Sequence, residues 1–367
     1  MSRAASTPLP PPINLALQGG GSHGAFTWGV LDALLEDGRL NFEGISGTSA
    51  GAMNAVALAH GLAQALEKAR PDPREAARES LAAFWNGVIA MGALGEAQRA
   101  PFGFLFGHAA DENSAAAPWL SAMSALWTST VSPYQSNPFD INPLRSFVAG
   151  QIDFEAVARQ AGKIPKVFVV ATRVSTGKAE IFSGERLSVD AVMASACLPT
   201  LFKAVEIDGQ HYWDGGYSGN PAIHPLIYQC TGRDIVLVQI NPIEREALPT
   251  SSAQILDRLN EISFNAALIA EMRAIDFVKR LLAEGKLDPA HYKDVLMHRI
   301  DGGEALEAFS AASKSSTSAA LIHQLRDLGR NHAQNWLQHH FKDLGQRSSV
   351  NIKSDYLDDL RLPVRGA

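Results

Sequence analysis

The chain has 367 residues, of which 46% are hydrophobic and 19% are charged. This composition is that of a globular protein, and the length suits one large domain, or one domain with an extension, that buries its own core. The formal net charge is −6 and no run of Lys and Arg occurs, which argues against a nucleic-acid partner because phosphate binding needs concentrated positive charge. No stretch of about 18 consecutive apolar residues is present, so no transmembrane span is predicted.

Residues 1–12 are rich in Ala, Ser, Thr and Pro and contain no apolar segment. We expect a flexible leader there and no secretory signal. Cys197 and Cys230 lie far apart and form no metal-binding or C-x-x-C pattern, so buried free thiols in a reducing compartment are expected. These features predict a cytoplasmic protein, able to lie peripherally at a membrane, that needs no metal and no cofactor.

The first sixty residues alternate between strand and helix signals. The apolar run 13–18 (INLALQ) predicts a buried strand, and the apolar spacing over 24–36 predicts a helix. A second strand is predicted at 42–46 and a helix of small residues at 50–60. This alternation indicates a parallel α/β sheet.

From about residue 70 to 140, Gly, Pro and aromatic residues replace that alternation, and we expect an insertion that caps the sheet. Its aromatic side chains could line a groove for an acyl chain or pack the insertion onto the sheet, and both interpretations stay open for Phe102, Phe104, Phe106, Trp119 and Trp127. Alternation then resumes, with strands predicted at 167–172, 179–182, 203–207 and 235–240, and a helix at 188–196.

After Pro242 the pattern is almost wholly helical, with long amphipathic stretches at 253–284 and 315–341. The apolar face of 253–284 is expected to cover core or a dimer surface, which makes a homodimer possible. We therefore expect a three-layer α/β/α sandwich with a mostly parallel central sheet. The predicted divisions are a leader (1–12), an α/β domain (13–245) with the cap-like insertion, a helical C-terminal extension (246–345) and a polar tail (346–367).

The segment Gly47–Gly51 (GTSAG) is a G-x-S-x-G match between a predicted strand and a predicted helix. Glycines beside the serine relieve a strained turn and let the helix pass close to the strand. The start of the helix also directs N–H groups at charge that develops near Ser49. Ser49 is therefore the candidate nucleophile, with Gly47 and Gly51 forming its elbow. The alternative is a close-packed glycine turn with an N-cap serine.

A glycine-rich loop, 19–24 (GGGSHG), follows the first predicted strand. Its G-x-G-x-x-G spacing fits a dinucleotide fingerprint, which needs an acidic residue at the end of the second strand. Glu43 is in range but precedes the apolar part of that strand. As an oxyanion hole, the loop would offer successive unhindered N–H groups to a developing alkoxide. We favour the oxyanion hole, with candidate residues Gly19, Gly20, Gly21, Ser22 and Gly24.

Asp214 is followed by Gly215 and Gly216 at the end of a hairpin-like stretch. Asp-Gly is a common turn, and most such aspartates only cap it. The alternative is a general base that the two glycines allow to approach Ser49. Considered alone, Asp214 fits the ordinary turn better, but its position after the other two motifs favours the general base.

These three motifs, in this order, resemble the signature elements of patatin-like phospholipases. Segments 171–177 and 194–202 also resemble the pattern of that family, so the resemblance covers about residues 13–240. It implies a Ser49–Asp214 dyad, an oxyanion held by the glycine loop, and an acyl-enzyme formed from phospholipids or related lipid esters at a membrane or micelle surface. His23 stands where the family commonly has Arg or Lys, and either a pH-sensitive role or a packing role is open.

Other functions remain open from the sequence. An esterase or thioesterase with a Ser–His–Asp triad is one, since His224 follows Asp214 in the chain order of α/β-hydrolases. The same site could support acyl transfer. A nucleotide-binding regulatory protein could use the glycine loop only to hold phosphate, and a lipid-surface protein could retain a vestigial site.

Overall fold

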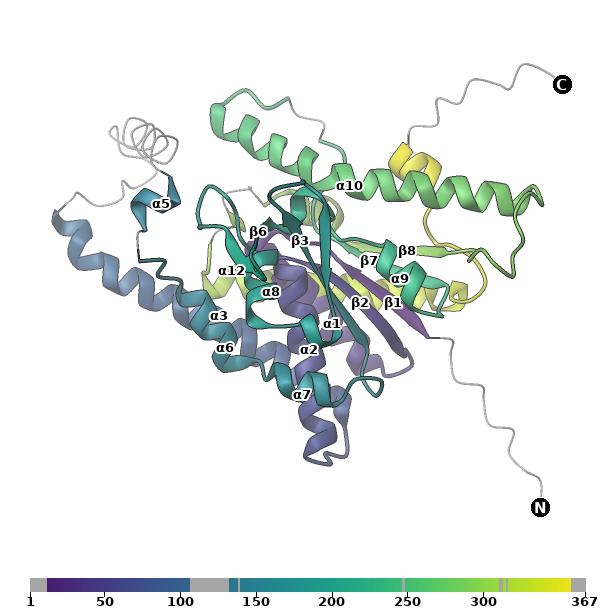
Figure 1. Ribbon diagram of the computed structural model, residues 1–367, viewed down its shortest axis with the longest axis horizontal. Helices are drawn as coiled ribbons and strands as arrows, with labels where there is room; N and C mark the ends of the chain where they lie inside the picture. Colours follow the sequence, from purple (N-terminus) through teal and green to yellow (C-terminus); the bar gives the residue numbers. More distant parts are fainter. Residues whose placement is uncertain are drawn as a thin grey trace.

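The computed structural model describes residues 12–105, 132–137, 139–245, 248–309, 313–314 and 316–357, and for 94–105 it describes the backbone only. The centre of the molecule is an eight-stranded sheet with the strand order β5-β6-β3-β2-β1-β7-β8, and β4 pairs with β3 beside this path. Helices surround the sheet in every view (Figure 1).

The strands are β1 (Ile13–Leu17), β2 (Phe42–Thr48), β3 (Lys166–Arg173), β4 (Ala179–Phe182), β5 (Val205–Ile207), β6 (Gln210–Asp214), β7 (Asp234–Gln239) and β8 (Leu296–Asp301). The longer helices are α1 (Gly24–Asp37), α2 (Ala50–Glu67), α3 (Pro73–Leu105), α6 (Pro143–Gln151), α10 (Ser252–Ala283) and α12 (Ala319–His340). The shorter ones are α5 (Pro133–Ser136), α7 (Phe154–Arg159), α8 (Val189–Ser195), α9 (His224–Gln229) and α11 (Gly303–Glu307).

Strands β3, β2, β1, β7 and β8 run parallel, while β4 and β6 run antiparallel to β3. The register places Leu17 beside Gly47 and Val238, at the carboxyl ends of β1, β2 and β7. The loops that follow these strands therefore leave the sheet at one edge. In open α/β sheets this is the edge at which ligands bind.

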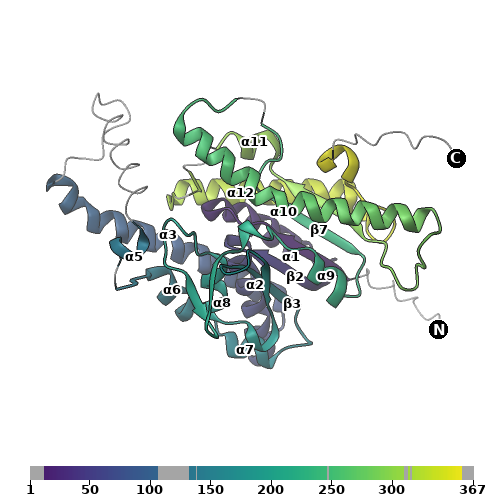
Figure 2. The same ribbon diagram turned by 45° about the horizontal axis from the view of Figure 1, so that its top comes forward.

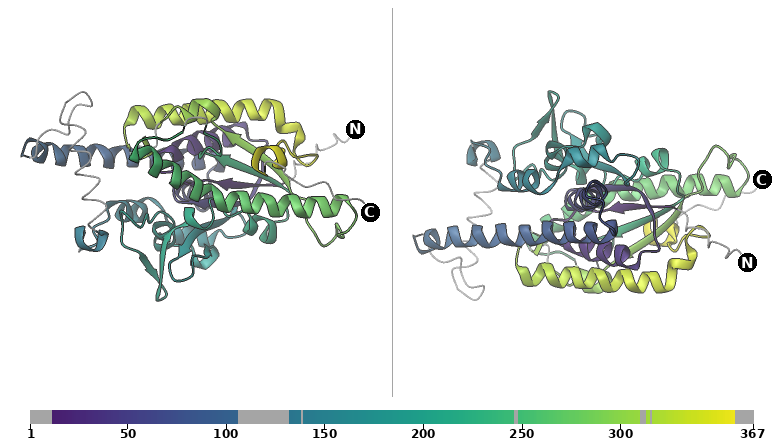
Figure 3. Two further views of the ribbon diagram at one scale, coloured as in Figure 1. Left: turned by 90° about the horizontal axis from the view of Figure 1, so that it is seen from above. Right: turned by 90° about the horizontal axis from the view of Figure 1, so that it is seen from below.

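Alternate residues of the central strands face two separate cores. In β1, Leu15 and Leu17 join the core under α1, α2, α3 and α12, whereas Ala16 joins the core under α9 and α10. Strands buried on both faces read as continuous apolar runs, which is why β1 is recognisable in the sequence. Views along the other axis show helices on both sides of the sheet (Figure 3), which confirms the predicted three-layer sandwich.

The C-terminal region is mostly helical, as predicted, but it also contains β8, which the sequence analysis missed. This strand pairs with β7 from Asp234↔Leu296 to Gln239↔Asp301. Its pattern is broken by His298, which is fully buried because its ring binds Asp234 (2.9 Å) and the Ser349 hydroxyl (3.1 Å). Because its partners come from distant segments, the sequence alone makes this buried strand look like an exposed polar stretch.

Helix α3 begins the segment in which a cap-like insertion (about 70–140) is expected. Residues 73–105 form one helix, and its buried side chains Leu81, Phe84 and Trp85 join the core beneath α1 and α2. The first half of the expected cap is thus part of the helical layer on the sheet. The aromatic side chains predicted for the cap, Phe102, Phe104, Phe106, Trp119 and Trp127, lie outside the described side chains.

The apolar face of α10 is only partly covered. Leu268, Met272 and Ile275 are buried in the core against β7, whereas Leu259 and Ile262 are 53% and 51% exposed. The second half of α10 therefore covers core, as expected.

Candidate active site

Ser49 lies at the turn between β2 and α2 with a left-handed backbone conformation (φ 53°, ψ −120°). A non-glycine residue with such angles carries local strain of about 1–3 kcal/mol and persists only where packing enforces it. The neighbouring glycines provide that packing: a Cβ on Gly51 would overlap the carbonyl oxygen of Leu17, and one on Gly47 would lie 2.5 Å from the carbonyl oxygen of Gly51. The strand and the helix are therefore closer than side chains would permit.

The N–H of Ser49 is held by a residue from another segment. It donates to the hydroxyl of Ser195, at 2.8 Å, near the end of α8. Ser195 is fully buried, so this bond holds the Ser49 turn from the interior of the protein. It also removes the Ser49 N–H from the donors that could bind substrate.

Asp214, at the end of β6, is 1% exposed. Its Oδ1 accepts the N–H of Gly216 at 2.7 Å, and the Ser49 hydroxyl lies close enough to the carboxylate to affect its pKa. Burial raises the pKa of Asp214 to about 7, although the Gly216 N–H and the Ser49 hydroxyl both act to lower it. The two side chains predicted as nucleophile and base are thus brought together, and the carboxyl titrates where a general base is effective.

The antiparallel strand β6 positions this carboxylate. Asp214 pairs with Ala171 in β3, and its N–H donates to the carbonyl of Cys197 at 2.8 Å. The next residue, Gly215, has no room for a side chain, because a Cβ there would overlap the carbonyl oxygen of Val170. The Asp-Gly-Gly sequence therefore brings the chain close to β3 as well as turning it.

The glycine loop lies directly against the nucleophile. A Cβ on Gly19 would lie 2.8 Å from the Cβ of Ser49. The Gly19 N–H donates to Asn220 Oδ1 (2.7 Å), and its carbonyl accepts from Asn241 Nδ2 (2.7 Å). In the part of the chain that the structure describes, no acceptor binds the N–H groups of Gly20 or Gly21, whose φ is +58°. Two donors are thus left for a ligand beside Ser49.

His23 closes the loop as a neutral ring. It is 2% exposed, its Nε2 binds the hydroxyl of Ser313 at 2.6 Å, and its ring packs edge-on against Phe309. Burial, followed by the charges of Lys314 and Arg245, lowers the pKa of His23 to about 4. His23 is therefore uncharged near neutral pH, which favours the packing role over a pH-sensitive one.

A profile of patatin-like phospholipases matches residues 15–227 of the chain. The chain belongs to that family. It therefore carries the domain of a lipid acyl hydrolase, and the matched segment contains Ser49, Asp214 and the glycine loop.

Among solved structures, the patatin-like chain resembles VipD from Legionella pneumophila, with 15% sequence identity, a TM-score of 0.38, and coverage of 95% of this chain and 73% of VipD. A TM-score of this size does not by itself establish a shared fold. No curated protein matches the sequence significantly.

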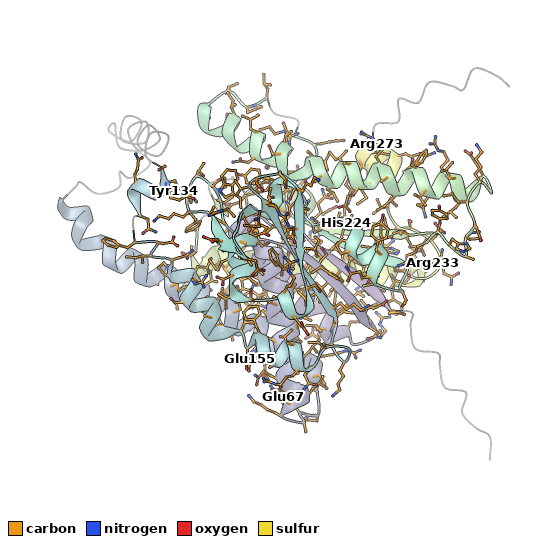
Figure 4. All side chains as sticks on the ribbon, in the orientation of Figure 1. Glu67, Tyr134, Glu155, His224, Arg233 and Arg273 are labelled. Atoms are coloured by element: carbon orange, nitrogen blue, oxygen red, sulfur yellow. The ribbon has the colours of Figure 1, made fainter. Side chains whose placement is uncertain are left out.

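No histidine in the described residues hydrogen-bonds to Ser49 or Asp214. His224 instead faces Glu271, with its Nδ1 3.2 Å from Oε1. In Figure 4, His224 on α9 lies on the same side of the molecule as Arg233, just before the start of β7, and away from Tyr134. His224, the candidate base of a triad, therefore interacts with Glu271 and not with Ser49 or Asp214.

Glu43 does not occupy the place of a ribose-binding carboxylate. It lies at the start of β2 and accepts the N–H groups of Thr231 and Gly232, both at 2.7 Å. The glycine loop follows the opposite end of the neighbouring parallel strand. Glu43 therefore cannot serve as the acidic residue that a dinucleotide-binding loop needs for the ribose.

Three residues around the site were not assigned a role from the sequence: Ser195, Asn220 and Asn241. Ser195 lies in the segment that resembles the family pattern, but nothing in the sequence links it to the Ser49 N–H. Asn220 and Asn241 are fully buried, and each binds Gly19 across about 200 positions of the chain. Contacts over such separations leave no local signal.

Cys197 lies near the site, and burial raises the pKa of its thiol to about 12, so it stays protonated and unreactive. Within the described ranges there is no cluster of three or more His, Cys, Asp or Glu side chains able to hold a metal ion. In the same ranges, no helix combines the length and hydropathy needed to cross a membrane.

Proposed function

We propose that this patatin-like protein hydrolyses the acyl ester bonds of phospholipids or related glycerolipids through a Ser49–Asp214 dyad. The observation that carries the proposal is that the Ser49 hydroxyl lies close enough to a buried carboxylate, Asp214, to act on its pKa, which burial raises to about 7. A base with such a pKa can accept the serine proton near neutral pH and return it in the same cycle.

In the first half of the reaction, Ser49 Oγ attacks the ester carbonyl carbon while its proton passes to Asp214. The carbonyl oxygen becomes an oxyanion next to the N–H groups of Gly20 and Gly21, which bind no acceptor among the described residues. When this intermediate collapses, the bond to the alcohol oxygen breaks, and the departing alcohol takes the proton from Asp214. An acyl-enzyme remains.

In the second half, a water molecule loses its proton to Asp214 as its oxygen attacks the acyl carbon. The Ser49–acyl bond breaks, and Oγ recovers the proton from Asp214. The products are a fatty acid and the regenerated dyad, and no metal or cofactor is required by this sequence of steps.

The proposal is tested by incubating wild type and Ser49→Ala with a panel of phospholipids and neutral glycerolipids, and measuring fatty acid release by mass spectrometry. We expect release by wild type only, and labelling of Ser49 by a fluorophosphonate probe. A folded wild-type protein that neither releases fatty acid nor reacts with the probe would contradict it. The lipid class from which fatty acid is released fastest identifies the preferred substrate.

The triad alternative is separated by a second set of variants. We expect His224→Ala to keep its activity, because its ring binds Glu271 rather than the site, while Asp214→Asn loses activity. Loss of activity in both variants would instead indicate a triad. The cytoplasmic location and the homodimer remain predictions, which fractionation and light scattering can test.

A further inference from the structure

A short C-terminal segment lies against the glycine loop, about 290 positions from it in the chain. The carbonyl oxygen of Lys314 occupies the space that a Cβ on Gly21 would need, and the Ser313 hydroxyl binds His23 at 2.6 Å. Figure 2 shows α10, α11 and α12, which flank this segment in sequence or in space, gathered at the top of the view. The loop is thus covered by a part of the chain that the family match does not include.

The side chain of Lys314 continues this contact into the interior. Its Nζ donates to Asn241 Oδ1 at 3.0 Å, and the Nδ2 of the same amide donates to the Gly19 carbonyl at 2.7 Å. The backbone N–H of Asn241 also donates to Gln18 Oε1 at 2.9 Å. Because Lys314 donates to the oxygen of the Asn241 side-chain amide, the amide nitrogen is turned toward the Gly19 carbonyl.

Lys314 belongs to a network of charged side chains centred on the buried carboxylate of Glu261. Glu261, 4% exposed, lies 3.9 Å from Lys314 and is also paired with Arg245 (2.8 Å) and Arg258 (3.2 Å). Burial acts to raise the pKa of Glu261, but the hydrogen bond from Arg245 and the charges of Lys314 and Arg245 hold it below its ordinary value. At His23, in the glycine loop, the positive charges of Lys314 and Arg245 act against the negative charge of Glu261, and positive charge near the loop favours an oxyanion.

From this geometry we infer that Lys314 is a positioning residue for the oxyanion loop and that it acts through Asn241. The inference rests on the proposed function of the loop. Lys314 does not touch the reacting atoms; it orients the amide that holds Gly19, and its carbonyl packs against Gly21 where a side chain would otherwise lie. The N–H groups of Gly20 and Gly21 are thereby held at one place before substrate arrives.

The test is a double-mutant cycle on a soluble short-chain p-nitrophenyl ester with Lys314→Met, Asn241→Ala and the double variant. We expect Lys314→Met to lower kcat about 10- to 100-fold with little change in KM, because misplaced donors affect the transition state more than binding. If Lys314 acts through Asn241, the double variant is no slower than Asn241→Ala alone. Lys314→Arg should recover part of the activity.

Lys342→Met is the matched control, because it removes an exposed lysine charge from the same C-terminal region and should leave kcat unchanged. Additive losses in the cycle, or a Lys314→Met variant that behaves as the control does, would overturn the inference. An inactive wild type would instead count against the proposed function.

A second readout does not depend on turnover. Amide hydrogen exchange of the peptide spanning residues 18–23 should be faster in Lys314→Met than in wild type and in Lys342→Met. Equal exchange in all three proteins refutes the positioning role whether or not the wild type hydrolyses the ester.

Discussion

Asp214 is almost completely buried, and its pKa of about 7 means that it is partly ionised at neutral pH. The opposing effects are desolvation, which favours the protonated form, and the Gly216 N–H and the Ser49 hydroxyl, which favour the carboxylate. Their near balance makes its state responsive to pH in the range where a hydrolase works.

The pH dependence of turnover follows from this balance. Only the carboxylate can accept the Ser49 proton, so we expect log(kcat/KM) on a soluble ester to rise by about one unit per pH unit below about pH 7 and to level off above it. The bend should lie at the pKa of Asp214, about 7. A bend near pH 4 would match an ordinary carboxyl and would exclude the raised pKa.

The same shift predicts that Asp214 lowers stability at alkaline pH. An unfolded aspartate has a pKa of about 3.9, whereas the folded one has a pKa of about 7. Between these values the folded state binds more protons than the unfolded state, so the free energy of unfolding falls as pH rises from about 4 to 7.

Asp214→Asn removes this charge. We expect it to be more stable than wild type at pH 8, by roughly 1–4 kcal/mol, while losing at least about 100-fold in kcat. Urea unfolding at pH 5 and pH 8 measures the difference. A variant less stable than wild type at both pH values would mean that the hydrogen bonds of the carboxylate outweigh its desolvation.

At the scale of elements, the strained turn depends on α8, which is a separate part of the fold. Ser195→Ala leaves the Ser49 N–H without its acceptor, and we expect a loss of about 1–3 kcal/mol in stability together with a roughly tenfold loss in kcat as the turn relaxes. Ser188→Ala, which removes the N-cap of the same helix, should cost about 1 kcal/mol and leave kcat unchanged. Equal kcat values for the two variants would show that Ser195 has no role in the turn.

The sequence predicted the elements that carry their own signals. β1 was recognisable from its apolar run. Ser49 was singled out because glycines flank it on both sides, and Asp214 because two glycines follow it, which indicates close approach of the backbone. The surroundings of Ser49 and Asp214 were not predictable, because Asn241 and Lys314 act through contacts that span 222 and 73 positions of the chain. β8 was missed for the same reason: the buried His298 is satisfied by residues from other elements.

At the scale of the whole molecule, the first and last long helices are in direct backbone contact. A Cβ on Gly29 in α1 would overlap the carbonyl oxygen of Arg326 in α12, and one on Gly329 would overlap that of Phe26. The two glycines thus permit a crossing that even alanine would obstruct.

Gly329→Ala should therefore destabilise the protein by about 1–3 kcal/mol, measured as a lower midpoint of thermal or urea unfolding. Gly150→Ala in α6 is the control, since a Cβ there meets nothing within 4 Å and should be neutral or stabilising by up to about 1 kcal/mol. If both substitutions had the same effect, the close crossing would not be a determinant of stability.

The crossing of α1 and α12 also bears on how the protein is made. During synthesis α1 emerges first and its packing partner is nearly three hundred residues away, so the apolar face of α1 stays uncovered until α12 has been translated. We expect a nascent chain that lacks α12 to be recognised by chaperones or to aggregate, because it exposes surface that only the finished chain can bury. Slow folding and sensitivity to C-terminal truncation would follow from a helix pairing that joins the two ends of the fold.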